Sequence, residues 1–256
     1  MFPTIQIGSF SIPTYTFLLV LGVSILIFGF FLFIYFKKKI PFDESGLVTL
    51  FLGISLLLGY LGGYVFDGLL KIGERGGFYF VSTAFYGGFL FASISFIILM
   101  IVFKKAHKRL DTLSYLNILT PFVIFAHALG RLGCFAAGCC YGAPTDSWAG
   151  VVFPNDAPSS LEYGPGTKVY ATQIYEMSAL IVILILSLSV KFFRKNAFFF
   201  YLLSYALARF IIEFYRGDDR GQSILLSPSQ WVAIVIFILT LGYIIFIYIK
   251  TKRQKI

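Results

Sequence analysis

The stretch GRLGCFAAGCCYG, residues 130–142, contains an arginine and all 3 cysteines of the chain. His127, Arg131 and Cys134 stand at i, i+4 and i+7, so a helix would carry these three side chains on one face. An arginine inside an apolar span faces the bundle interior, a water-filled cavity or an anionic partner, because its insertion into lipid costs about 2.5 to 3.5 kcal/mol. This face is therefore predicted to form one wall of an anion-binding cavity.

The thiols of this stretch allow three interpretations. Together with His127 they form H-x6-C-x4-C-C, which is a possible metal-ligand set, and the adjacent Cys139 and Cys140 suggest a thiol/disulfide couple on an oxidising side of the membrane. The spacing lacks the paired C-x2-C of zinc modules and the C-x-x-C of redox proteins. Small, soft side chains that pack between helices are the third interpretation, and we favour it, with no metal ligand expected.

A second polar stripe follows in SYALARFIIEFYRGDDRG, residues 204–221. Tyr205, Arg209 and Glu213 recur every four residues and Arg216 comes at the next turn, which places them along one helical face. We interpret this face as a second wall of the cavity, open to the outer leaflet. The structural alternatives are a self-neutralising Arg209/Glu213 pair, or arginines that snorkel to the interface. The pair is compatible with a ligand, because guanidinium donors remain.

The rest of the chain is suited to hold these walls in a bilayer. Hydrophobic residues make up 58% and charged residues 13%, values typical of integral membrane proteins. Because one crossing needs about 20 apolar residues, 256 residues supply roughly seven crossings. The predicted fold is an all-α polytopic membrane protein with seven transmembrane helices, in one domain covering residues 1–256. The predicted spans are 14–36, 46–70, 78–103, 113–138, 172–190, 196–214 and 229–249.

The basic residues predict the orientation of this bundle. Most of the 21 Lys and Arg residues cluster directly after the odd-numbered spans, at positions 37–39, 104–109, 191–195 and 250–255. By the positive-inside bias, the N-terminus lies outside and the C-terminus in the cytoplasm. The net charge of +9 is then a topology signal that also favours anionic membrane lipids, and no nucleic-acid partner is expected.

Two further expectations concern the ends of the spans. The N-terminal residues lack a basic n-region and a small-residue cleavage pattern, so we expect the first helix to be retained. The polar, Gly- and Pro-rich insert at residues 141–171 lies on the outer side under this topology. It is predicted to form turns and a small outward-facing loop cap.

Several motifs resemble one known family when they are taken in order. They are IPTYTF with Tyr15, TAFYGGFLF in the third span, GRLGCFAAGCCYG followed by APTDSWAGVVFP, then TQIYE, and YALARFIIEFYRGDD followed by LSPSQW. Together they cover nearly the whole chain. The sequence resembles the bacterial prolipoprotein diacylglyceryl transferases, seven-helix enzymes of the plasma membrane.

The resemblance implies that the diacylglyceryl group of phosphatidylglycerol is transferred to the lipobox cysteine in the signal peptide of a preprolipoprotein. Glycerol phosphate leaves, so Arg131 and Arg209 suit the phosphate, and the acceptor thiol must become a thiolate. The chemistry demands no metal or soluble cofactor, and it needs a lateral opening for membrane-embedded substrates. The predicted catalytic residues are Arg131, Arg209, Glu213, Tyr205, His127 and Tyr86. The predicted substrate-binding residues are Arg131, Tyr15, Gly142, Gly87, Gly88 and Arg216.

This sequence departs from the family at three places. Tyr86 stands where the family commonly has a histidine, and Cys134 and Cys139 replace an asparagine and a glutamate. Tyr170-Ala171 replaces a histidine-proline pair. Because tyrosine is a much weaker base at neutral pH, we hypothesise that His127 takes over as base or hydrogen-bond partner.

Two alternative functions remain open on the sequence alone. The changed residues near the thiol-activating region motivate a relative that transfers from phosphatidylglycerol to another acceptor. An arginine-lined cavity also suits a non-enzymatic binder or transporter of anionic lipids, although the internal repeats common in transporters are absent from the sequence.

Overall fold

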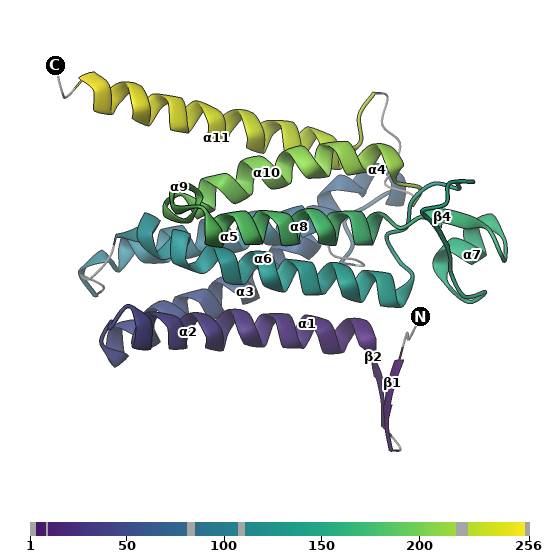
Figure 1. The fold of residues 1–256 in the computed structure, drawn as a ribbon, viewed down its shortest axis with the longest axis horizontal. Helices are drawn as coiled ribbons and strands as arrows, with labels where there is room; N and C mark the ends of the chain where they lie inside the picture. Colours follow the sequence, from purple (N-terminus) through teal and green to yellow (C-terminus); the bar gives the residue numbers. More distant parts are fainter. Residues whose placement is uncertain (1–3, 9, 81–84, 107–110, 219–224, 254–256) are drawn as a thin grey trace. The chain divides into compact units, whose positions relative to one another are not determined.

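The computed structural model describes residues 4–8, 10–80, 85–106, 111–218 and 225–253, which are mostly helical (Figure 1). The chain divides into two compact units. The α3–α5 unit comprises Ile25–Leu119, and the α8–α10 unit comprises Met1–Ser24 with Thr120–Ile256. The first boundary falls where the π-helical η1 (Ile25–Gly29) follows α1, and the second falls within α6, next to Pro121.

The length and composition of the helices make this a polytopic membrane protein. Within the described residues, 6 helices are long and apolar enough to cross a bilayer, and Gly87–Val102 is a shorter apolar helix. Helices satisfy all backbone hydrogen bonds within the segment, which lipid requires. The six lie at Thr14–Lys37, Phe42–Leu69, Thr112–Ala137, Thr172–Ser189, Ala197–Tyr215 and Pro228–Ile247.

The predicted spans agree with these helices except at the third. The prediction starts that span at residue 78, whereas α5 begins at Phe85 and ends at Val102. Residues 78–80 are not helical, and residues 81–84 lie outside the described ranges.

In the α3–α5 unit, α3 (Phe42–Leu70) packs along α5 (Phe85–Val102) through small residues. A Cβ atom added to Gly59 would lie 2.7 Å from the carbonyl oxygen of Gly88 and 2.7 Å from the Cβ of Ala92. Such close backbone approach is typical of helix pairs in membranes. The remaining elements of this unit are η1, α2 (Phe30–Leu32), η2 (Phe33–Lys37), α4 (Ile72–Arg75) and η3 (Lys104–Ala106).

In the α8–α10 unit, α10 lies between α8 and α11 (Figure 1). A serine capping box starts α11: the Oγ of Ser227 accepts from the Gln230 backbone N–H at 3.2 Å, and Oε1 of Gln230 accepts from the Ser227 N–H at 2.9 Å. The helices are α1 (Thr14–Ser24), the part of α6 (Thr112–Ala137) from Thr120 onward, α8 (Thr172–Ser189), α9 (Lys191–Lys195), α10 (Ala197–Ile212), η4 (Glu213–Tyr215) and α11 (Pro228–Arg253).

The prediction of an all-α fold is wrong at two small antiparallel sheets. β1 (Thr4–Ile7) pairs with β2 (Phe10–Pro13) ahead of α1, and β3 (Gly150–Val152) pairs with β4 (Lys168–Tyr170). Their strands have only 4 and 3 residues, too short for a period-2 pattern to stand out in the sequence.

The second sheet belongs to the polar insert at residues 141–171, which also contains α7 (Pro158–Tyr163). Four buried side chains form a core of its own, and Phe135, Val151 and Tyr163 pack against it. The insert is therefore an ordered subdomain rather than a string of turns. The core residues are Tyr141, Phe153, Ala157 and Val169.

Candidate functional site

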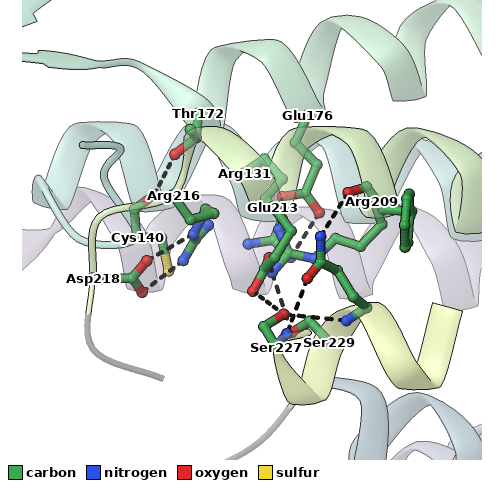
Figure 2. Close-up of polar contacts among 12 residues, drawn as sticks. Arg131, Cys140, Thr172, Glu176, Arg209, Glu213, Arg216, Asp218, Ser227 and Ser229 are labelled. Carbon is green, nitrogen blue, oxygen red and sulfur yellow. Dashed lines mark hydrogen bonds and ion pairs between the residues drawn. The ribbon is translucent and has the colours of Figure 1, made fainter. Parts of the chain in front are cut away.

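A fully buried carboxylate, Glu176 on α8, joins three helices of the α8–α10 unit (Figure 2). Its Oε1 lies 2.9 Å from Nη2 of Arg131 on α6, and its Oε2 lies 3.3 Å from Nη1 of Arg209 on α10. Two guanidinium groups from helices far apart in sequence thus share one anion. A charge buried in the bilayer requires such a partner.

Two aromatic hydroxyls and the imidazole of His127 extend this network. The hydroxyl of Tyr205 donates to Oε1 of Glu176 at 2.5 Å. The ring of His127 has Nδ1 3.0 Å from the Tyr201 hydroxyl and Nε2 3.5 Å from the Tyr205 hydroxyl. The predicted role of His127 as a base stays a prediction, but both ring nitrogens already face tyrosine hydroxyls.

Arg209 also pairs with Glu213, one turn further along the chain, at 2.6 Å. The Arg209/Glu213 pair suggested by the four-residue spacing is therefore present. Glu213 accepts from the Ser227 hydroxyl at 2.8 Å, and Nη2 of Arg209 lies 3.4 Å from Oγ of Ser229. Ser227 and Ser229, at the start of α11, thus hold the Arg209/Glu213 pair in place.

The end of α6 brings the cysteines together. The N–H of Gly138 bonds to the carbonyl of Phe135 and that of Cys139 to the carbonyl of Cys134, both at 3.2 Å. With Gly138 at φ 68, this is a Schellman motif, which folds the residue after the glycine back over the last helical turn. The Sγ atoms of all three cysteines lie within 4.8 Å of one another, a convergence that the sequence spacing did not indicate.

Arg216 lies beside Cys140 and is held by a bidentate pair with Asp218 (Figure 2). Both hydrogen bonds, from Nε and Nη2, are 2.7 Å long. Hydrogen bonds from the neighbouring thiols, followed by the charges of Arg216 and Arg131, hold the pKa of Cys140 well below its ordinary value. Burial raises the pKa of Asp218, while Arg216 acts in the opposite direction.

Gly142 positions the backbone next to Arg216. Its N–H bonds to the carbonyl of Tyr170 at 2.8 Å, and it forms an antiparallel bridge with Arg216. An added Cβ would come within 2.6 Å of the Tyr215 carbonyl oxygen, so only glycine fits. The structure explains Gly142 by this close approach, and its predicted contact with substrate remains a prediction.

The other predicted residues fall in two places. Tyr15 of α1 packs on α6, since an added Cβ at Gly133 would lie 3.1 Å from its ring. Gly87 and Gly88 belong to the α3–α5 unit and allow α5 to approach α3. Tyr86 stands in the first turn of α5, and its side chain lies outside the described part of the structure.

Four residues of the network were missing from the predicted site: Glu176, Tyr201, Ser227 and Ser229. Glu176 is an acidic residue in an otherwise apolar span, and two buried arginines require anions, so that signal was present in the sequence. The serines occur in LSPSQW, where the S-x-x-Q pattern also predicts the capping box.

Comparison with known proteins gives one consistent result. A family model described as "Prolipoprotein diacylglyceryl transferase" matches residues 3–247. The chain is similar to the phosphatidylglycerol–prolipoprotein diacylglyceryl transferase of Clostridium tetani, with 37% identity over 150 residues, which cover 57% of this chain and 58% of the relative. The protein of the same name from Dehalococcoides mccartyi strain 195 is 28% identical over 262 residues, which cover 98% and 94%.

A second clostridial relative, phosphatidylglycerol–prolipoprotein diacylglyceryl transferase 2 of Clostridium perfringens, is 34% identical over 151 residues. These cover 58% of this chain and 57% of the relative. The matches to the two clostridial proteins therefore span less than two thirds of each relative's length, whereas the match to the Dehalococcoides protein spans nearly all of it.

Proposed function

The chain belongs to the prolipoprotein diacylglyceryl transferase family, and on that basis we propose that it transfers the diacylglyceryl group of phosphatidylglycerol to a cysteine thiol of preprolipoproteins. The products are a thioether-linked lipoprotein precursor and glycerol phosphate. The observation that carries this proposal is the pair of buried guanidinium groups, Arg131 and Arg209, held by one carboxylate. The leaving group is a phosphate ester, and preorganised cations stabilise the charge that develops on it.

Arg131 is the residue proposed to touch the lipid phosphate. Its side chain is 10% exposed, against 2% for Arg209 and 0% for Glu176. Glu176 engages Nη2 of Arg131 and thereby fixes the plane of the guanidinium group. Arg209 neutralises Glu176 and is held by Glu213, so it acts as a positioning residue. Fixed orientation matters because bidentate recognition of phosphate depends on geometry.

We further propose seven crossings of the bacterial plasma membrane, with the N-terminus outside and the C-terminus in the cytoplasm. The basic clusters after alternate spans support this orientation. It would put the end of α6 and the insert at residues 141–171 on the outer side. Alkaline phosphatase fused to residue 256 should be inactive and a cytoplasmic fluorescent protein active, and the reverse result would invert the topology.

Complementation of a bacterial strain depleted of its transferase tests the activity. The wild-type chain should restore growth, and Arg131→Ala should not, with a loss of transfer on the order of 10²-fold or more in a purified assay. The assay measures transfer from labelled phosphatidylglycerol to a lipobox peptide. Lys195→Ala, which removes an exposed cation on α9, is the matched control and should rescue growth.

Each failure has a defined meaning. Rescue by Arg131→Ala would remove this residue from the phosphate site. If the wild-type chain consumes phosphatidylglycerol but leaves the lipobox peptide unmodified, the acceptor is a different molecule. If it binds phosphatidylglycerol without consuming it, the chain is a lipid binder and the proposed chemistry is wrong.

A further inference from the structure

The three thiols at the end of α6 have the spacing of a metal site. Their Sγ atoms all lie within 4.8 Å of one another. Among the described residues, these three thiols form one set of candidate metal ligands. Three thiolates around one Zn²⁺, each with a Zn–S bond of about 2.3 Å, lie roughly 3.8 Å apart. A contraction of less than about 1 Å would therefore close the thiols around one cation.

The backbone departs from ordinary geometry to bring the third thiol in. Cys140 has φ 62, the left-handed region, which non-glycine residues seldom adopt and which costs free energy. Packing of a small side chain gives no reason for this strain, because glycine at this position would relieve it. A shared ligand does give a reason, since the left-handed turn lets Cys139 and Cys140, although adjacent, point toward the same place.

Side chains from α8 hold this strained turn. Oγ1 of Thr172 donates to the carbonyl of Cys140 at 2.8 Å, and Nε2 of Gln173 donates to the carbonyl of Cys139 at 2.6 Å. Both Thr172 and Gln173 are fully buried. Such outer partners orient ligating residues in metal sites and keep a site assembled before the ion binds.

A cation also stands beside the thiols. The guanidinium of Arg216 gives Nε and Nη2 to Asp218, while Nη1 is buried and, among the described residues, has no hydrogen-bond acceptor. A divalent cation bound by three thiolates carries one net negative charge. Arg216 next to Cys140 supplies the compensating field that a buried anionic centre needs (Figure 2).

From this geometry we propose that Cys134, Cys139 and Cys140 bind one thiophilic divalent cation, Zn²⁺, and leave a fourth coordination position for the acceptor thiol of the transfer reaction. The inference rests on the proposed transfer to a cysteine. Zinc sites with three protein ligands and one open position are the catalytic type. A thiol bound to a metal is deprotonated without a strong base nearby. The metal therefore also explains how Tyr86 can stand where the family commonly has a histidine.

The step balances with the substrates of the transfer alone. The acceptor S–H binds Zn²⁺ and releases its proton. The bound sulfur then attacks the carbon of the diacylglyceryl group that is bonded to the phosphate oxygen. An S–C bond forms and the C–O bond breaks. The electron pair leaves with glycerol phosphate, which takes up the proton released by the thiol.

Metal content of the purified full-length protein tests the site without any transfer reaction. Wild-type protein kept reduced and equilibrated with Zn²⁺ should retain about one equivalent per chain by mass spectrometry of the metal. Cys134→Ser, Cys139→Ser and Cys140→Ser should each lose it. Ala136→Ser, which adds a hydroxyl to the same turn of α6 and leaves the thiols intact, is the matched control and should retain it.

Cobalt substitution tests the fourth position. In Co²⁺-loaded protein the thiolate-to-metal charge-transfer band scales with the number of thiolates, so a lipobox peptide should raise it by about one third. The same peptide with serine in place of cysteine should leave the band unchanged. Removal of Zn²⁺ by a chelator should lower transfer on the order of 10²-fold, the size of a general-base contribution, and added Zn²⁺ should restore it.

Wild-type protein that retains no more Zn²⁺ than Cys140→Ser would overturn the proposal, and so would a cobalt band that is insensitive to the peptide thiol. Both measurements omit phosphatidylglycerol, so their failure leaves the proposed transferase activity untouched. Conversely, Zn²⁺-loaded protein with the expected cobalt response but no transfer would count against the proposed activity and not against the metal site.

Discussion

The two units of this protein differ in the contacts at which their helices approach most closely. In the α8–α10 unit, three helices meet around the fully buried carboxylate of Glu176. In the α3–α5 unit, two helices approach through Gly59 and Gly88, and an ion pair between Lys71 and Asp67 lies at the end of α3. Buried ion pairs are weak devices for stability, whereas close packing of small residues is an effective one in lipid. Charge is thus concentrated where the proposed chemistry needs it.

Glu176→Gln should have the largest effect of the substitutions considered. It removes the anion shared by Arg131 and Arg209, and breaking a buried pair costs about 3 to 5 kcal/mol. We expect loss of transfer together with a lower thermal midpoint in detergent. Ser187→Ala, which removes a buried hydroxyl bonded within α8 at 2.8 Å, is the control and should change neither greatly. Full activity of Glu176→Gln would mean that Arg131 is oriented by other groups.

Tyr205→Phe should have the next largest effect. Its hydroxyl donates to Glu176 at 2.5 Å, and a hydrogen bond to a charged group is worth about 1.5 to 3 kcal/mol. Tyr201→Phe removes a hydroxyl that faces the imidazole of His127. Loss of this neutral hydrogen bond should destabilise the network by only about 0.5 to 1.5 kcal/mol. Kinetics of transfer with both variants checks the order. Equal losses would indicate that His127, rather than Glu176, organises the site.

Gly59→Ala should destabilise the α3–α5 unit by overpacking the contact between its two helices. The added Cβ would lie 2.7 Å from the Gly88 carbonyl oxygen, a backbone atom that cannot turn away, and overpacking costs about 1 to 3 kcal/mol. Gly53→Ala on the same helix has open space around it and should be neutral or stabilising by up to about 1 kcal/mol. Thermal unfolding of the two variants measures the difference. Similar midpoints would show that α3 and α5 tolerate separation.

Ser227→Ala should have the smallest effect of the series. It removes the capping hydroxyl of α11 and the hydrogen bond to Glu213, and loss of an N-cap costs about 0.5 to 2 kcal/mol. We expect a modest fall in thermal midpoint and a small fall in transfer rate. Ser227→Thr keeps the hydroxyl and should restore both. If it does not, the contact with Glu213 is incidental.

Local patterns predicted the parts of the site that lie on one helix. The four-residue spacing of Tyr205, Arg209 and Glu213 was sufficient for their shared face and for the pair at 2.6 Å. The family expected from the ordered motifs is confirmed by the family model over residues 3–247. Periodicity and motif order are properties of the sequence itself, which is why these predictions succeed.

The remaining features depend on contacts or dihedral angles that spacing does not encode. Glu176 meets Arg209 across 33 residues of sequence, and a polar residue in an apolar span does not indicate which helix it will face. The thiols converge only because Gly138 and Cys140 both adopt positive φ. The strands of 3 and 4 residues are too short to be distinguished from loop.

The Schellman turn at the end of α6 has a consequence for biogenesis. Cys134 and Cys139 come together through hydrogen bonds of the helix end itself, so their contact has a very low contact order, whereas the left-handed turn at Cys140 is held by Thr172 at the start of α8. The Glu176 network must wait for α8 and α10, across separations of 29 and 33 residues. During membrane insertion we therefore expect Cys134 and Cys139 to come together first, before Cys140 is fixed by α8 and before the charges of the Glu176 network meet.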